Sequence, residues 1–251
     1  MRPYIISVGI DPLLHDWATT NDFLLSTKPA GTCIYRGIYP LGLSVVQDQW
    51  LRTKCFDRLF EYCYLPSDAK GRIRAQLVQS LFSEIGTTYY NEAITLSINV
   101  ECYNALFLGA LPYISSSTTR VLDVGCGPGT ILNSLAVQQA TSLIGFDFVD
   151  ANCVEARRRG LTIVNATGLA AMPSNSIDIM LCTFVLHYET LLEEDITQLI
   201  RILCCGGIWA ANFHKSKGLG WFTDMLKSKG NFTFEQAPSH YGQLLFARSS
   251  E

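Results

Sequence analysis

From Thr119 onward, short apolar runs alternate with segments of helical spacing, and this alternation restricts the fold more than any other feature of the sequence. The apolar runs are RVLDVG, SLIGFD, LTIVNA, IDIMLCTF and GIWAANF, and the helical segments are TILNSLAVQQ, DANCVEARRR, EEDITQLIRIL and GWFTDMLKSKG. Strands that are apolar on both faces are typical of a parallel sheet covered by helices on both sides. The alternation therefore predicts βαβ units and an α/β fold.

The C-terminal stretch NFTFEQAPSHYGQLLFARSS contains two more strand-like runs with a short link between them. Parallel neighbours need a long crossover connection, whereas antiparallel neighbours can be joined by a tight turn. We therefore expect this stretch to form an antiparallel hairpin.

Residues 1–95 show a different pattern, and we expect a separate helical region there. The segments DQWLRTKCFDRLFEYC and GRIRAQLVQSLFSEIG carry apolar residues at helical spacing, and Gly86 is expected to cap the second. A third helix is expected over 91–108, whereas residues 1–44 have no clear periodicity. The predicted organisation is a helical lid region over 1–95 followed by an α/β domain over 96–251.

Composition and charge argue against a nucleic-acid-binding protein. The chain is 48% hydrophobic and 16% charged, with a formal net charge of −3, whereas non-specific nucleic-acid binding needs clustered Lys and Arg. The run Arg157 to Arg159 ends a predicted helix, where the helix dipole favours cations, so we interpret it as structural. The excess apolar surface should line a small-molecule pocket or a subunit interface, which leaves a homodimer open.

The cysteines and the apolar stretches indicate the environment of the chain. Its nine cysteines are an odd number without a C-x-x-C pair, so neither a disulfide framework nor a metal site is predicted. The first apolar run is too short for a signal peptide, and the longest, ALFLGALPYI, is about half the length of a membrane span. We expect a soluble, cytoplasmic protein with reduced thiols and no membrane span.

The stretch VLDVGCGPGT crowds three glycines into the end of the first strand of the α/β part. In an open parallel sheet, ligands bind beyond the carboxyl ends of the strands. Gly125, Gly127 and Gly129 let the backbone turn sharply and approach a ligand, and the expected following helix would offer free N–H groups. The spacing is neither G-x-G-x-x-G nor that of a P-loop, so a dinucleotide or a nucleoside triphosphate is not the first hypothesis.

VLDVGCGPG resembles the first motif of class I S-adenosylmethionine (SAM)-dependent methyltransferases. IGFDFVDANCVEARRRG is similar to the second-strand region of this family, MPSNSIDIMLCTFVLHY to its fourth strand, and RILCCGGIWAANF to its fifth, with Cys204 and Cys205 where Lys-Pro is usual. The resemblance covers roughly residues 90–251. It implies a Rossmann-like seven-stranded sheet, mostly parallel, that ends in the antiparallel hairpin.

The resemblance also implies how SAM is held. Asp147 would accept both ribose hydroxyls, a task that suits a carboxylate, and Phe148 would pack on adenine. Asp123 would supply negative charge for a cationic cofactor. Thr167 or Gly168 stands where an acidic residue often receives the adenine amino group. The other implied cofactor-binding residues are Tyr90, Gly125, Cys126, Gly127, Gly129, Cys182 and Thr183.

Two histidines are candidates for removing a proton from the methyl acceptor. His187 follows the fourth strand of the α/β part, and His214 follows the fifth, so both should lie at the carboxyl ends of strands. Tyr90, from the N-terminal helices, resembles an aromatic residue that closes over the cofactor in related enzymes; a plain core tyrosine is the alternative.

The sequence thus favours methyl transfer from SAM to oxygen, nitrogen or carbon of a small, fairly hydrophobic metabolite in biosynthesis. No NPPY-like stretch and no Pro-Cys dipeptide occurs, which disfavours methylation of nucleic-acid bases. The alternative is a cyclisation or rearrangement on the same fold, with SAM bound but no methyl group transferred.

Overall fold

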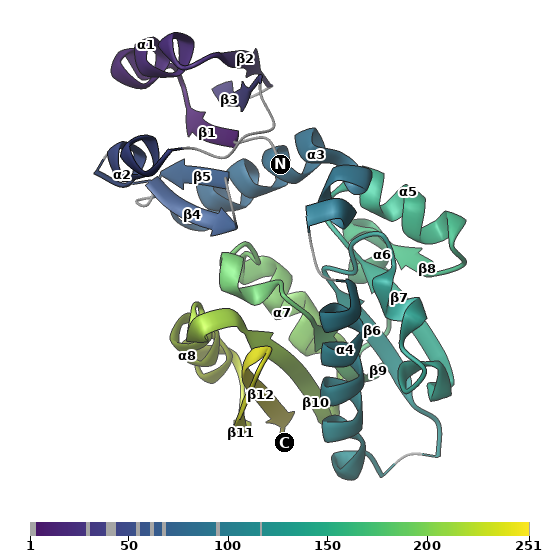
Figure 1. The fold of residues 1–251 in the computed structure, drawn as a ribbon. Helices are drawn as coiled ribbons and strands as arrows, with labels where there is room; N and C mark the ends of the chain where they lie inside the picture. Colours follow the sequence, from purple (N-terminus) through teal and green to yellow (C-terminus); the bar gives the residue numbers. More distant parts are fainter. Residues whose placement is uncertain are drawn as a thin grey trace. The chain divides into compact units, whose positions relative to one another are not determined.

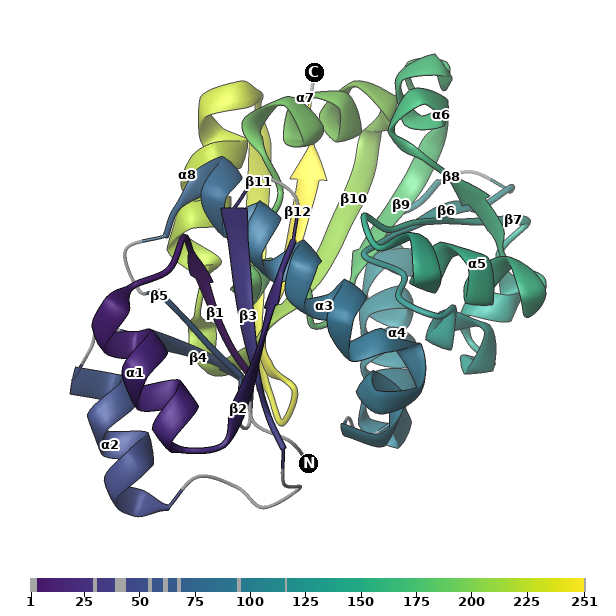
Figure 2. The same ribbon diagram turned by 90° about the horizontal axis from the view of Figure 1, so that it is seen from above.

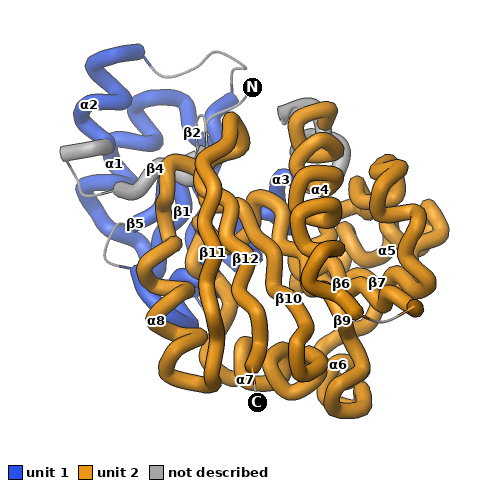
Figure 3. Tube along the Cα trace, turned by 90° about the horizontal axis from the view of Figure 1, so that it is seen from below, with its two compact units in different colours: residues 1–85 blue, residues 86–251 orange. Residues whose placement is uncertain are grey.

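The computed structural model divides into two compact units, residues 1–85 and 86–251, coloured separately in Figure 3. The structure describes residues 4–28, 31–38, 44–53, 56–60, 63–66, 69–93, 96–115 and 117–250. In these residues, no helix is both long and apolar enough to cross a membrane.

The second unit is built on a seven-stranded sheet with the order β11-β12-β10-β9-β6-β7-β8 (Figure 1). The strands are β6 (Arg120–Val124), β7 (Ser142–Phe146), β8 (Thr162–Val164), β9 (Ile177–Cys182), β10 (Leu203–Phe213), β11 (Phe232–Ser239) and β12 (Gly242–Ser249). The neighbours from β8 to β10 pair in parallel, whereas β12 is antiparallel to β10 and to β11. The predicted Rossmann-like sheet with a C-terminal hairpin is confirmed.

Helices cover both faces of this sheet (Figure 2). They are α4 (Leu96–Ala110), α5 (Asp150–Arg158), α6 (Ala166–Ala171), α7 (Glu193–Ile202) and α8 (Leu219–Lys229). Alternate strand residues point to opposite faces. Val121 packs in one core cluster with residues of α4 and α5, and Leu122 in another with residues of α6, α7 and α8. The apolar runs are buried strands because both faces are covered.

The segment after the first strand departs from the expected helix. TILNSLAVQQ forms two short 3-10 turns, η3 (Thr130–Asn133) and η4 (Val137–Gln139), separated by residues 134–136, of which Ser134 is extended. The Ser134 hydroxyl accepts from the N–H of Val137 at 3.2 Å, and the side chain of Asn104 accepts from the N–H of Ala136 at 3.3 Å. Side chains thus take over hydrogen bonds that would otherwise extend a helix.

The first unit is an α+β module, so the expectation of a helical region over 1–95 is wrong for its first part. Its strands β1 (Tyr4–Val8), β2 (Phe23–Thr27), β3 (Thr32–Gly37), β4 (Phe56–Phe60) and β5 (Cys63–Pro66) form a sheet with the order β2-β3-β1-β5-β4. Its helices are α1 (Pro12–Thr20), α2 (Val45–Thr53) and the first part of α3 (Gly71–Ala93).

The strands β4 and β5 replace the predicted helix over DQWLRTKCFDRLFEYC, of which only the first residues are helical, in α2. Short apolar runs fit both periodicities, and Phe and Tyr favour strands. Strand β5 lies between β1 and β4, where Tyr64 and Leu65 are both buried. Burial on both faces of the sheet therefore favours a strand over a helix for β5.

Helix α3 is interrupted at Gly86, the first residue of the second unit. The backbone there has φ +73° and ψ 163°, a conformation that favours glycine. The sequence predicts the end of a helix at this residue. A second helical stretch follows it, up to Ala93.

Candidate cofactor site

The parallel strands β6, β7, β9 and β10 end side by side, and we call this side of the sheet the carboxyl edge. Asp123 lies on β6 directly opposite Gly145 of β7 and Leu181 of β9. Asp147 follows β7, and Thr183 follows β9. The topology therefore gathers residues that are far apart in the sequence at the place where such sheets bind ligands.

The glycine turn, residues 125–129, has a different requirement at each glycine. Gly125 has φ +76°, and a Cβ there would lie 2.4 Å from Cγ2 of Val185, so no side chain fits. Gly127 has φ +52°, and no atom lies within 4 Å of where its Cβ would be. Its N–H donates to Oδ2 of Asp147 at 2.8 Å. The turn is thus packed at Gly125 and open at Gly127.

Asp147 is held by the backbone on both of its oxygens. Oδ1 accepts from the N–H of Val149 at 2.8 Å, and Oδ2 accepts from Gly127. Burial raises the pKa of the Asp147 carboxyl, while the N–H groups of Val149 and Gly127 and the Asn152 side chain act to lower it. A carboxylate offers about four acceptor positions, so further hydrogen bonds to a ligand remain feasible.

Asp123 is fully buried beneath the glycine turn. The hydroxyl of Tyr103, from α4, donates to Oδ2 of Asp123 at 2.9 Å. Burial raises the pKa of Asp123 to about 8, partly offset by the Tyr103 hydrogen bond and increased further by the nearby charge of Asp147. Two carboxyl groups in one partly dry site form an environment that favours a cation.

The residues implied for adenine have the following surroundings. Phe148 is half-buried and lies edge-on to Phe146, with ring centroids 4.9 Å apart. Thr167 is exposed in the first turn of α6. The N–H of Gly168 donates to the side chain of Asn165, which caps this helix, at 2.8 Å. The side chain of Asn165 therefore already binds the N–H of Gly168, a residue that the sequence resemblance implies for the cofactor site.

The two cysteines implied for the site have buried side chains. Cys126 belongs to the core cluster between α4 and the sheet. The sulfur of Cys182 accepts from the indole N–H of Trp209 at 3.1 Å. These thiols therefore serve packing, and the backbone is what they present to a ligand. The Thr183 hydroxyl, in contrast, is buried beside the thiol of Cys102 and meets no stronger hydrogen-bonding group among the described residues.

The two candidate histidines lie close together at the carboxyl edge. His187, in the 3-10 turn η5 (Leu186–Tyr188), is 8% exposed, and its ring centroid lies 4.0 Å from that of Tyr188 and 6.3 Å from that of His214. His214 follows β10 and is exposed. A buried and an exposed imidazole thus meet where the acceptor is expected.

The loops after β9 and β10 carry unusual backbone conformations. Phe184, Glu189, Lys215 and Ser216 all have φ between +53° and +58°. A positive φ is rare for a bulky residue such as Phe184. Its N–H donates at 2.6 Å to Asn212, whose side chain donates at 2.8 Å to the carbonyl of Tyr241. Asn212, fully buried, therefore holds two loops of the carboxyl edge.

Helix α4 supplies contacts that sequence reasoning missed. The Tyr241 hydroxyl donates to Oε2 of Glu101 at 3.2 Å, and Nε2 of His240 lies 3.5 Å from the same atom. Tyr103 reaches Asp123, and the next residue, Asn104, reaches Ser134. Neighbouring residues of one helix thus contact several loops of the carboxyl edge. No local motif marks them. The side chain of Tyr90, implied as a lid residue, lies outside the described part of the structure.

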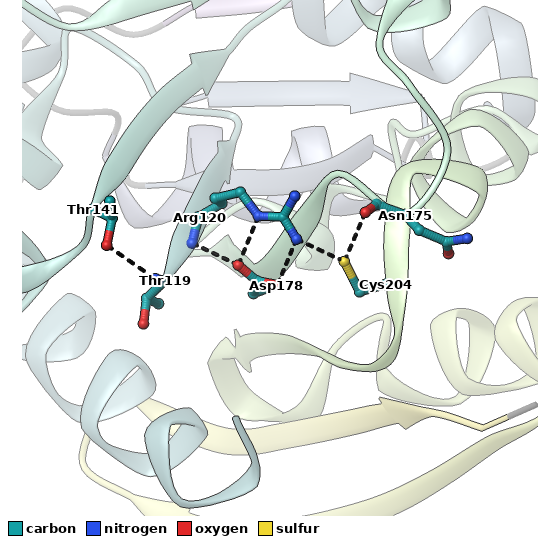
Figure 4. A network of polar contacts seen from close by, with 6 residues as sticks. All are labelled: Thr119, Arg120, Thr141, Asn175, Asp178 and Cys204. Atoms are coloured by element: carbon teal, nitrogen blue, oxygen red, sulfur yellow. Dashed lines mark hydrogen bonds and ion pairs between the residues drawn. The ribbon is translucent and has the colours of Figure 1, made fainter. Parts of the chain in front are cut away.

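The opposite end of the strands, which we call the amino edge, carries a different polar network (Figure 4). The backbone and guanidinium of Arg120 donate three hydrogen bonds to Asp178, at 2.8, 2.9 and 2.9 Å. Burial acts to raise the pKa of Asp178, but the hydrogen bonds from Arg120 outweigh it, and the pKa is lowered. The Cys204 thiol accepts from Arg120 at 3.1 Å and donates to the carbonyl of Asn175 at 3.0 Å. This network ties β6, β9 and β10 together at their starts.

Comparison with known proteins identifies the second unit. Residues 122–211 match the family model of the methyltransferase domain. The chain is similar, at 14% identity and a TM-score of 0.51, to a SAM-dependent methyltransferase structure from Methanococcus maripaludis, with 73% of this chain and 97% of that chain covered. No curated protein matches the chain.

Two further solved structures were obtained with cofactor molecules. The magnesium protoporphyrin IX methyltransferase of Synechocystis, with bound SAM, is 15% identical with a TM-score of 0.51, and the match covers 70% of this chain and 97% of that one. The plantazolicin methyltransferase, in complex with S-adenosylhomocysteine (SAH) and a pentazolic desmethylPZN analogue, is 16% identical with a TM-score of 0.51, and the match covers 72% of this chain and 97% of that one. The second unit thus has the fold of class I SAM-dependent methyltransferases, and its residues 122–211 match the methyltransferase domain. These matches support an enzyme of this class with SAM as its cofactor.

The residues at the carboxyl edge fit SAM. Gly127 opens onto free space, Asp147 and Asp123 place two carboxyl groups beside the turn, and Thr183 has a buried hydroxyl without a strong partner among the described residues. The cofactor carries an ammonium group, a sulfonium and a vicinal diol, which match carboxylates and hydroxyl groups.

Proposed function

We propose that this enzyme transfers a methyl group from SAM to a small, fairly hydrophobic metabolite bound at the carboxyl edge of the second unit. The observation that carries this proposal is the pairing of two carboxyl groups at the glycine turn with the aromatic and imidazole side chains after β9 and β10. The first group of residues suits the cofactor, and the second suits an apolar acceptor.

In this proposal the chain holds the cofactor from several sides. The Asp147 carboxylate accepts the ribose hydroxyls, and Phe148 contributes an apolar surface for adenine. Asp123, which accepts a hydrogen bond from Tyr103, adds a second carboxyl group for a cationic cofactor. Bound SAM supplies an electrophilic methyl group on a sulfonium. In such displacements, most of the rate comes from holding the two reactants in line.

On the acceptor side, Phe184 and Tyr188 offer aromatic surface, and His187 and His214 offer sites for a proton. A base is needed only where the acceptor must lose a proton before or during transfer. His187 is buried and held by ring contacts, so it suits a fixed proton acceptor, while the exposed His214 can exchange a proton with solvent.

The N-terminal region over 1–95 is proposed to act as a lid, as the apolar residues at helical spacing in GRIRAQLVQSLFSEIG suggest. Closure would exclude water from the sulfonium. Hydrogen exchange with and without SAH tests this: protection that appears around residues 89–92 supports a lid. Protection confined to the segments around Gly125 and Asp147 would contradict it. Assembly as a homodimer stays a prediction, for which analytical ultracentrifugation is the direct test.

The function itself is tested by calorimetry and by product mass. Wild-type protein should bind SAM and SAH, and a set of hydrophobic hydroxyl, amine and activated-carbon compounds should contain one whose mass rises by that of a CH2 group, because a methyl group replaces a proton. Absence of SAM binding would contradict the cofactor role. A substrate that is consumed without a change of mass would favour the alternative, a cyclisation or rearrangement.

A further inference from the structure

One arginine of the run Arg157 to Arg159 contacts the glycine turn directly. Nη1 of Arg159 donates to the carbonyl of Pro128 at 2.9 Å, and Nη2 donates to Oδ1 of Asn133 at 3.1 Å. Pro128 lies within the turn, and Asn133 is the last residue of η3. A single guanidinium therefore joins the two ends of the segment 128–133.

Helix α5, which Arg159 follows, also packs against this turn. A Cβ on Gly129 would lie 3.3 Å from Cα of Ala156, so the turn and the helix are in close contact. Ala156 itself is fully buried. We call the two hydrogen bonds of Arg159 to Pro128 and Asn133 the clamp. Arg159 follows helix α5, and the packing of this helix fixes its position relative to the turn.

The neighbouring arginines have other surroundings. Arg158 donates to both carboxylate oxygens of Glu155, at 2.8 and 2.7 Å, and is exposed. Arg157 is exposed as well. Because three identical side chains follow one another at the end of one helix, Arg158 provides a matched control for Arg159.

The turn has an unusual need for such support. The expected α-helix after it is replaced by a four-residue 3-10 turn and an extended residue, Ser134. Continuous helical hydrogen bonds, which would hold the residues after the turn, are therefore missing there. A guanidinium can replace part of them because it donates several charge-assisted hydrogen bonds in a rigid geometry.

We propose that Arg159 is a positioning residue that holds the glycine turn in its cofactor-binding conformation. The proposal rests on the assignment of SAM to this turn. A turn that is held before binding loses less conformational freedom when the cofactor arrives, so the clamp raises affinity without a contact to the reacting atoms. Because it acts on the backbone and not on the sulfonium, it supports SAM and SAH to the same extent.

The test compares three variants of the full chain, Arg159→Ala, Arg159→Lys and Arg158→Ala, by calorimetry with SAH and SAM. We expect Arg159→Ala to raise both dissociation constants about tenfold, the equivalent of one lost charge-assisted hydrogen bond. Arg159→Lys should fall between Arg159→Ala and wild type, because one ammonium cannot reproduce the fork. Arg158→Ala should bind as wild type does.

A second readout separates positioning from a general loss of structure. Hydrogen exchange of the unliganded proteins should become faster in the segment 125–133 of Arg159→Ala and stay unchanged in β6, β9 and β10. Should Arg159→Ala fail to fold, Asn133→Ala removes one of the two acceptors and should give a smaller rise in the dissociation constant for SAH, about threefold.

Wild-type affinity in Arg159→Ala, or an equal loss in Arg158→Ala, would overturn the proposal. So would faster exchange spread evenly over the sheet. Failure of the wild-type protein to bind SAH would instead contradict the assignment of the cofactor, so the two failures are distinguishable.

Discussion

Buried carboxyl groups have opposite pKa shifts at the two ends of the strands β6, β9 and β10. At the amino edge, Asp178 is matched by three hydrogen bonds from Arg120, and its pKa is lowered. At the carboxyl edge, Asp123 and Asp147 have raised pKa values, because burial outweighs the donors that reach them. A satisfied ion pair stabilises a fold, whereas buried carboxyl groups without a cation destabilise the free protein and favour a cationic ligand.

The backbone shows the same contrast. Among the described residues of the second unit, five non-glycine residues have a left-handed conformation. Four of them, Phe184, Glu189, Lys215 and Ser216, lie in loops of the carboxyl edge. The fifth is Asn175 at the amino edge, and asparagine adopts this conformation more readily than most residues. Strained backbone tends to collect at functional sites, where the surrounding structure holds it in place. We therefore interpret the amino edge as the stabilising end of the sheet and the carboxyl edge as the ligand-binding end.

The largest expected effect is on cofactor binding by Asp147→Ala. Loss of the carboxylate proposed to accept the ribose hydroxyls should raise the dissociation constant for SAM about 100-fold, or about 2.7 kcal/mol. Calorimetry measures it. Asp150→Ala is the control, since Asp150 is exposed in the first turn of α5 and should bind SAM normally. Equal losses in both variants would contradict the role of Asp147.

On the amino edge, Asp178→Ala should lower the free energy of unfolding by about 2 kcal/mol, because Arg120 loses a buried partner. Urea denaturation measures this change. The dissociation constant for SAH should stay within about twofold of wild type, well under 1 kcal/mol. A large loss of affinity in a folded Asp178→Ala protein would show that the two edges do not have separate roles.

The stability of the free protein should depend on pH through Asp123. Its pKa is about 8 in the folded chain and about 4 in the unfolded chain, so the folded state keeps its proton as pH rises. Stability contributed by this group is therefore greatest below pH 4 and is lost between pH 4 and 8.

Asp123→Asn removes this titration and tests the same point. Relative to wild type, the variant should become progressively more stable as the pH is raised from 4 to 8, while its affinity for SAM falls. Urea denaturation at several pH values gives the stability difference. A difference that is constant over this range would contradict the raised pKa.

The smallest effect is expected for Cys204→Ala. The thiol links Arg120 to the carbonyl of Asn175, but Arg120 keeps its bonds to Asp178 in the variant. The free energy of unfolding should fall by about 0.5 kcal/mol, with no change in SAH binding. A loss above that of Asp178→Ala would mean that the thiol, and not the ion pair, holds the amino edge.

The second unit could be predicted well from the sequence because its signals are local. Apolar runs such as IDIMLCTF are buried strands, and the last two strands form the expected hairpin. The place of Asp147 after β7 follows from the same pattern. In contrast, β4 and β5 were not predictable from apolar spacing, because runs of Phe, Tyr and Cys fit a helix and a strand equally until the sheet around them is known.

The contacts that shape the site depend on residues distant in the sequence. Tyr103 and Asp123 are 20 residues apart, and Arg159 and Pro128 are 31 apart. No spacing rule connects them, since the packing of α4 and α5 on the sheet creates both contacts. The 3-10 turn after the glycines was likewise hidden, because the side chains of Asn104 and Ser134 that replace the helical hydrogen bonds come from two separate segments.

The central claim, that the carboxyl edge binds the cofactor and the amino edge does not, is tested most directly by hydrogen exchange of the whole chain with and without SAH. We predict slower exchange on binding in residues 123–129, 147–149 and 183–187, and no change in residues 175–178 and 204–207. Protection that appears at the amino edge, or is absent from the glycine turn while SAH is bound, would contradict it.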